Sequence, residues 1–164
     1  MAESSAGSST GTQIVTLSER LVIMRMEASS AEEVIRQLAA RLEAEGFVRP
    51  SFVEAVLERE RTHPTGLPLA GDLHVAIPHA DVVHVISPAL AIATLARPVI
   101  FRNMVNPEEM VPVSIVILMA LDEPHSQIEM LQRLAAFFQE PQRVRQVYEA
   151  RTAEELIQAL DLLS

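Results

Sequence analysis

The sequence of 164 residues predicts a single α/β domain in which a small mixed β-sheet is flanked by helices. Short apolar runs, which are typical of buried strands, are separated by amphipathic segments with helical periodicity. Four of the predicted helix starts carry a serine or threonine followed three residues later by glutamate, a pattern that caps helices. The predicted order is one strand, two helices, several strands and then three helices.

The N-terminal region divides into a tail and the first strand. Residues 1–17 are expected to form a disordered tail, because the first 13 residues are rich in serine, glycine and threonine and offer little to bury. The domain is expected to span residues 18–164. Its first strand is predicted at Leu21–Met24, an apolar run between two arginines.

The predicted helices are marked by capping boxes, in which a hydroxyl and a glutamate satisfy orphan backbone donors. The boxes are Ser30 with Glu33, Ser51 with Glu54, Ser126 with Glu129 and Thr152 with Glu155. The second helix ends in the charged run Glu58–Arg61, whose ordinary interpretation is a solvated last turn in which the helix dipole favours arginine. Pro141 marks the first position of another helix.

Apolar runs in the middle of the chain predict the strands of the sheet. Residues 62–73 contain two prolines and two glycines and are expected to form a loop without regular structure. A short buried strand follows at Val75–Ile77, and further strands are predicted at residues 89–95 and 99–101. Residues 113–121 form the most apolar run, which predicts a central strand buried on both faces.

Composition excludes several classes of function. The formal net charge of −9 disfavours binding to nucleic acid or to an anionic membrane, since both need a positive surface. The absence of cysteine excludes disulfides, thiolate nucleophiles and cysteine-ligated metals, and the absence of lysine excludes Schiff-base chemistry. No apolar run approaches the roughly 20 residues of a membrane span, and the N-terminus lacks the regions of a signal peptide. A cytoplasmic protein is therefore expected.

Two of the five histidines are candidate reactive residues. His79 and His125 each follow a proline, and each comes just after an apolar strand. If the two strands run the same way, both imidazoles emerge at the same edge of the sheet, where ligands gather in α/β proteins. A simpler interpretation stays open, in which both are strand-end histidines bonded to nearby backbone.

The surroundings of His125 favour anionic chemistry. A capped helix follows it, and the N-terminus of a helix presents free N–H groups and a positive dipole. Together with Arg59 from the charged run, the two histidines would suit a phosphoryl group. A metal site is not expected, because His74, His79 and His84 are spaced by five residues, which on a strand points successive side chains to opposite faces.

Three motifs resemble, in the same order, those of the fructose/mannitol-type IIA components (EIIA type 2) of the bacterial phosphoenolpyruvate-dependent sugar phosphotransferase system (PTS). Gly71-x-x-x-Val75-Ala76-Ile77-Pro78-His79 is similar to the active-site signature, Leu57-Glu58-Arg59-Glu60 to a helix end, and residues 124–134 to the second-histidine helix. Pro64-Thr65-Gly66-Leu67-Pro68, with Asp81 and Glu123-Pro124-His125, resembles the galactitol-like subgroup. The resemblance covers about residues 18–163.

The resemblance implies a phosphocarrier with the IIA fold. His79 would accept a phosphoryl group on Nε2 from the phosphohistidine of HPr and pass it to a cysteine of the IIB component. His125 would hydrogen-bond the phosphoryl oxygens or orient His79, and Arg59 would stabilise their charge. The membrane IIC component would choose the sugar, and no metal or cofactor would be required.

Three alternatives stay open. Nitrogen-regulatory IIA proteins share the fold and the histidine but signal through their phosphorylation state, and the galactitol-like loop argues against this role. A hydrolase is disfavoured because Ser51, Ser87, Ser114 and Ser126 lack a Gly-x-Ser-x-Gly elbow. The third alternative is a pure interaction module.

Overall fold

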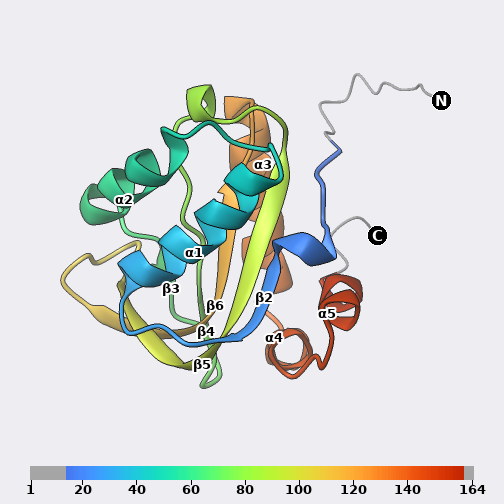
Figure 1. Ribbon diagram of the computed structural model, residues 1–164. Helices are drawn as coiled ribbons and strands as arrows, with labels where there is room; N and C mark the ends of the chain where they lie inside the picture. The colour runs from blue at the N-terminus through green and yellow to red at the C-terminus, as the bar shows by residue number, and fades with distance from the viewer. Residues whose placement is uncertain (1–13, 161–164) are drawn as a thin grey trace.

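The central layer of the structure is a mixed β-sheet. Over residues 14–160, which are those that the computed structural model describes, the sheet has five strands in the order β2-β5-β6-β4-β3 (Figure 1). The strands are β2 (Val22–Met26), β3 (Gly66–Leu67), β4 (His74–Ala76), β5 (Ala89–Arg102) and β6 (Met110–Ala120). β2 runs parallel to β5 and β4 runs parallel to β6, whereas the β5–β6 and β3–β4 pairs are antiparallel.

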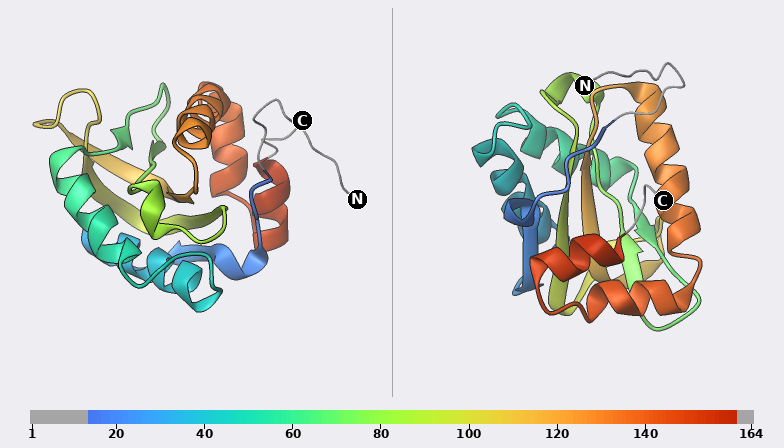
Figure 2. Two further views of the ribbon diagram at one scale, coloured as in Figure 1. Left: turned by 90° about the horizontal axis from the view of Figure 1, so that it is seen from above. Right: turned by 90° about the vertical axis from the view of Figure 1, so that its right-hand side faces the viewer.

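Helices cover both faces of the sheet (Figure 2). One face carries α1 (Ala31–Ala44) and α2 (Phe52–Thr62), and the other carries α3 (Pro124–Phe137), α4 (Pro141–Tyr148) and α5 (Ala153–Ala159). Short 3-10 helices, η1 (Glu19–Leu21) and η2 (Val82–His84), precede β2 and β5. Each face buries its own apolar core, so the predicted α/β domain with a mixed sheet and flanking helices is confirmed.

β6 is the central strand, as its run of apolar residues predicts. It pairs antiparallel with β5 and parallel with β4, and each residue from Val113 to Ala120 is buried. Val116 and Leu118 enter the core under α1 and α2, whereas Ile115 and Ile117 enter the core under α3 to α5. Burial on both faces explains why this stretch shows no alternation of apolar and polar residues.

Two predictions about the sheet are wrong. Residues 89–95 and 99–101 belong to one strand, β5, because the exposed residues 96–98 cross an irregularity in its register, where a proline is tolerated. Gly66–Leu67, within the expected loop, pairs antiparallel with Val75–Ala76 as the edge strand β3. Pro68, which directly follows β3, has no backbone N–H to donate, so the strand cannot continue through it.

Two of the four capping boxes form only in part. Oγ of Ser30 accepts a hydrogen bond from the backbone N–H of Glu33 at 3.1 Å, and Oγ1 of Thr152 accepts one from Glu155 at 3.0 Å. Each glutamate, however, accepts from the backbone N–H of the residue before the cap, at 2.7 Å in both helices. The hydroxyl half of each box is thus confirmed, and the glutamate half is displaced by one residue.

Ser51 and Ser126 do not cap their helices. Ser51 has a right-handed helical backbone and no capping hydrogen bond, and its Oγ lies 2.8 Å from Nδ1 of His84 instead. α3 begins at Pro124, two residues before Ser126, because the fixed φ of proline suits the first helical position. The box predicted at Ser126 therefore lies inside the helix.

The structure describes only part of the two terminal regions expected from the sequence. Residues 1–13 of the expected tail and residues 161–164 of the expected domain lie outside the described residues. Thr16 forms a parallel bridge with Ala89, so pairing with the sheet begins at residue 16 rather than 18. Between residues 14 and 160, none of the helices combines the length and the apolar character needed to cross a membrane.

Candidate functional site

His79 lies beyond the end of β4, at the carboxyl edge of the sheet. The carbonyl oxygen of Pro78 accepts a hydrogen bond from the backbone N–H of Met119 at 3.0 Å, so the segment stays bonded to β6 after β4 ends. His79 is only 5% exposed. The structure therefore places it where the sequence predicts, at the end of a short buried strand.

The backbone next to His79 selects its tautomer. Nδ1 of His79 lies 2.9 Å from the carbonyl oxygen of Ile77. A carbonyl oxygen can only accept, so Nδ1 carries the hydrogen and the lone pair of the neutral ring is on Nε2. Burial lowers the pKa of His79, the bond to Ile77 acts in the opposite direction, and the charge of Arg59 lowers it further. The lowered pKa favours the neutral imidazole, and within the described residues Nε2 of His79 has no hydrogen-bond partner.

Arg59 lies in the last turn of α2. Its positive charge lowers the pKa of His79, which follows β4, a strand separated from α2 in the sequence by residues 63–73. Arg61, two residues further on, pairs with Glu58 at 3.1 Å on the exposed surface of the same helix. Within residues 14–160, Arg59 forms no such ion pair, so its guanidinium is available to an anionic ligand.

His125 lies in the first turn of α3, at the same edge of the sheet as His79. Because β4 and β6 are parallel, the segments that follow them emerge together. The side-chain amide of Gln127 donates to the carbonyl oxygen of Ala80 at 2.7 Å and so ties the first turn of α3 to the residue after His79. The side chain of His125 is exposed and, unlike that of His79, makes no hydrogen bond within the described part of the chain.

Two contributors to the site were missed by sequence reasoning. Thr65, from the expected irregular loop, has its Oγ1 3.2 Å from the backbone N–H of Ile77 and is 2% exposed. Gln127 binds Ala80 as described above. The motif around Thr65 was the available signal, but nothing in it shows which backbone group the hydroxyl meets.

The remaining histidines have separate partners. Nδ1 of His74 accepts a hydrogen bond from the backbone N–H of Leu69 at 2.9 Å, and His84 contacts Ser51. His63 is exposed at the end of α2. Among the described residues, no three His, Cys, Asp or Glu side chains gather in a way that could hold a metal ion.

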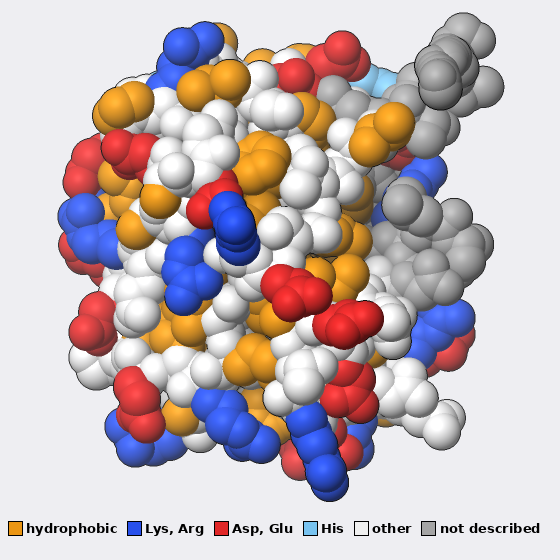
Figure 3. Space-filling view, turned by 45° about the vertical axis from the view of Figure 1, so that its right-hand side comes forward, with side chains coloured by type: hydrophobic (Ala, Val, Ile, Leu, Met, Phe, Trp, Pro, Cys, Tyr) orange, Lys and Arg blue, Asp and Glu red, His pale blue; other side chains and the backbone are white. Residues whose placement is uncertain are grey.

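The face of the molecule shown in Figure 3 carries both acidic and basic side chains. Acidic and basic side chains are interspersed over the face shown in Figure 3, with apolar side chains between them. The excess of 22 acidic over 13 basic residues does not gather into a single acidic field on this face.

Comparisons of the sequence identify related proteins. The family model for the phosphoenolpyruvate-dependent sugar phosphotransferase system, EIIA 2, matches residues 16–162. The galactitol-specific EIIA component of Escherichia coli (strain K12) is 30% identical over 109 residues, which cover 66% of this chain and 71% of that protein. The 2-O-alpha-mannosyl-D-glycerate-specific EIIABC component of the same strain is 30% identical over 154 residues, or 90% of this chain and 22% of that protein.

Solved structures resemble the fold closely. The crystal structure of IIA mannitol from Escherichia coli has a TM-score of 0.72 at 23% identity and covers 88% of this chain and 99% of that one. The IIA chain in a complex with phosphorylated IIB mannitol from the same organism has a TM-score of 0.73 at 21% identity, over 90% and 98% of the two chains. At this level of identity the likeness concerns the fold.

Proposed function

This chain belongs to the EIIA type 2 family of the phosphoenolpyruvate-dependent sugar phosphotransferase system, and we propose that His79 is its phosphoryl acceptor. The donor would be the phosphohistidine of HPr, and the acceptor of the next step a cysteine of the IIB component. The observation that carries the proposal is the 2.9 Å contact between Nδ1 of His79 and the Ile77 carbonyl oxygen, which leaves Nε2 free to attack.

The transfer can be written with protein groups alone. The lone pair on Nε2 of His79 forms a bond to phosphorus while the bond from phosphorus to the donor imidazole breaks, and that electron pair stays on the donor. In the second step the IIB thiolate attacks phosphorus and Nε2 leaves with the electron pair. Phosphoryl transfer of this kind depends chiefly on positioning and on stabilising the charge of the three oxygens.

Arg59 and His125 are proposed to stabilise that charge. Arg59 presents a permanently charged, planar set of donors that has no carboxylate partner within the described residues. His125 is exposed in the first turn of α3, where free backbone N–H groups also favour an anion. His125 lies at the same edge of the sheet as His79, and the charge of Arg59 acts on the pKa of His79.

The proposed partners follow from the same family. One solved structure pairs a similar IIA chain with phosphorylated IIB, which supports a IIB acceptor here. Relatives at 30% identity are named for galactitol and for 2-O-alpha-mannosyl-D-glycerate, so the proposal is a galactitol-like transport component whose IIC partner selects the sugar. We place the carrier in the cytoplasm with HPr. A nitrogen-regulatory role has less support, because both of these relatives are transport components.

The proposal is tested by phosphorylating the chain with enzyme I, HPr and labelled phosphoenolpyruvate. Wild-type protein should gain one acid-labile phosphoryl group. His79→Gln should abolish labelling, because glutamine has no nucleophilic ring nitrogen. His63→Gln, at an exposed position, is the matched control and should be labelled like the wild type. Labelling of His79→Gln would reject the site, and an unlabelled wild-type chain would reject the carrier role.

A further inference from the structure

A chain of hydrogen bonds connects Glu60, at the end of α2, to His79. The carboxylate of Glu60 accepts from the backbone N–H of Thr65 at 2.9 Å and from the Thr65 hydroxyl at 3.0 Å. Oγ1 of Thr65 in turn accepts from the backbone N–H of Ile77 at 3.2 Å, and the carbonyl oxygen of Thr65 accepts from the same N–H at 3.3 Å. The carbonyl oxygen of Ile77 accepts from Nδ1 of His79 at 2.9 Å. Ile77 is therefore held on both sides, by Thr65 and by the imidazole.

The ionised carboxylate gives this chain its direction. A carboxylate can only accept, so the hydroxyl hydrogen of Thr65 must point at Glu60. The lone pairs of the same oxygen are then left for the N–H of Ile77. A neutral acid or an amide at position 60 accepts fewer hydrogen bonds, which frees the hydroxyl to turn away from Ile77.

We propose that Glu60 is a positioning residue for His79: acting through Thr65 and Ile77, it holds the imidazole as the Nδ1–H tautomer with Nε2 free. The proposal rests on the role of His79 as phosphoryl acceptor. Glu60 itself does not touch the phosphoryl group. The ionisation of Glu60 determines how strongly the imidazole of His79 is held with Nε2 free.

The segment that carries Thr65 has little room to compensate for a lost contact. Thr65 is 2% exposed, and the next residue, Gly66, accepts from the backbone N–H of Met104 at 2.8 Å. A Cβ atom on Gly66 would lie 2.5 Å from the carbonyl oxygen of Arg102, so the end of β5 presses against this backbone. The position of Thr65 is thus set from one side by β5 and from the other by Glu60.

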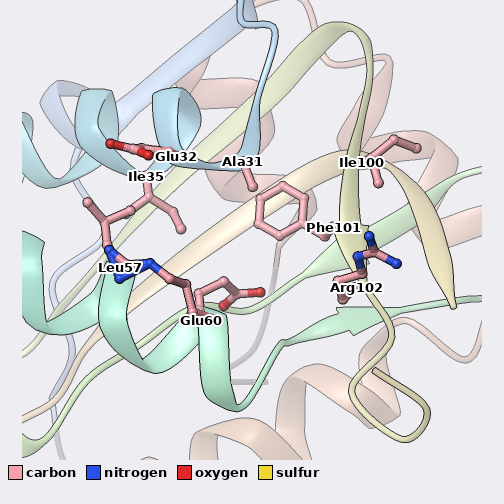
Figure 4. A pocket seen from close by; sticks show the side chains of 9 residues that line it. Ala31, Glu32, Ile35, Leu57, Glu60, Ile100, Phe101 and Arg102 are labelled. Atoms are coloured by element: carbon pink, nitrogen blue, oxygen red, sulfur yellow. The ribbon is translucent and has the colours of Figure 1, made fainter. Parts of the chain in front are cut away.

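Glu60 is reached by solvent through a pocket. The pocket has a volume of about 180 Å³, and Leu57, Phe101 and Arg102 line it together with Glu60 (Figure 4). The pocket lies beside Glu60 and does not include His79. It gives protons a path to the carboxyl group that avoids the proposed phosphoryl site.

Burial of the Glu60 carboxyl group brings its pKa close to neutral pH. Burial raises its pKa to about 7, while the hydrogen bonds from Thr65 and the charge of Arg59 lower it. The other charged groups that face the pocket are Glu32 on α1, Arg61 on α2 and Arg102 on β5. Because the ionised form accepts the Thr65 bonds, presentation of His79 should strengthen as the pH rises through about 7.

The test compares Glu60→Gln with the wild type by imidazole ¹⁵N NMR and by the rate of phosphorylation from phospho-HPr. Between about pH 6 and about pH 8, the variant should show a larger share of the Nε2–H tautomer. Its rate at the upper pH should fall about five- to tenfold, the effect of weakening one hydrogen bond. Glu58→Gln, two residues earlier on the same helix and exposed, is the matched control and should keep both properties.

Two results would overturn the proposal. One is an unchanged tautomer ratio and pH profile in Glu60→Gln, and the other is the same change in Glu58→Gln. If Glu60→Gln does not fold, Thr65→Val and Thr65→Ser replace it: valine should reproduce the loss and serine should retain the wild-type behaviour, and equal behaviour of the two would reject the relay. If phospho-HPr does not label the wild type, the proposed function fails, but the NMR comparison still tests the positioning of His79.

Discussion

The two histidines at the carboxyl edge of the sheet occupy opposite environments. His79 is buried, its tautomer is set by the Ile77 carbonyl oxygen, and the chain before it stays bonded to β6. His125 and Arg59 are exposed and have no side-chain partner within the described residues. Under the proposed function, the hydrogen bond to Ile77 positions His79 before the phosphoryl group arrives. Arg59 and His125 have different roles, because they stay free to bind the phosphoryl oxygens.

Substitution of Arg59 is expected to have the largest effect on the rate of phosphoryl transfer. Arg59→Gln should slow phosphorylation from phospho-HPr by at least about tenfold, because a charged hydrogen bond to the transferring oxygens is lost. It should also raise the pKa of His79, since the charge of Arg59 lowers it. Stopped-flow transfer and an NMR titration measure the two effects. Arg61→Gln, which removes a surface pair with Glu58, is the control, and an equal loss in that variant would deny Arg59 a special role.

His125 should show a smaller effect on rate with no effect on the fold. His125→Ala should slow transfer about tenfold in both directions, because one donor to the phosphoryl oxygens is removed while His79 stays in place. Its far-UV circular dichroism and its tautomer at His79 should match the wild type. Unchanged rates from HPr and to IIB would remove His125 from the mechanism.

The smallest expected effect concerns stability against pH. The pKa of His79 is lowered in the folded chain, so below its ordinary value of about 6.5 the unfolded chain binds more protons and the free energy of unfolding falls as the pH falls. Glu60 acts in the opposite sense, because its pKa is raised by folding. Urea denaturation at several pH values should therefore show a weaker acid-side loss in His79→Gln than in the wild type. Parallel curves for the two proteins would contradict the buried, neutral state of His79.

The local sequence pattern predicted the central strand and the position of His79, but it did not predict the partner of Ser51 or the strand β3. The apolar run of β6 and the proline before His79 are local signals, so the central strand and the strand-end histidine could be predicted. The capping serine at Ser51 failed because its hydroxyl meets His84, a partner 33 residues away. The strand β3 was missed for the same kind of reason, since its pairing with β4 outweighs the turn-forming tendency of the prolines near it.

The sequence by itself determined the class of the fold, the family resemblance and the choice of His79, His125 and Arg59, because each depends on residues that are neighbours in the chain. Only the tertiary structure decided that β4 and β6 run parallel, that Nδ1 of His79 meets a carbonyl oxygen, and that Glu60 reaches Ile77 through Thr65. The physical reason is that hydrogen-bond partners, burial and pKa shifts depend on how separate segments pack. The contact between Thr65 and Ile77 spans 12 residues and that between Ala80 and Gln127 spans 47, beyond the reach of any local pattern.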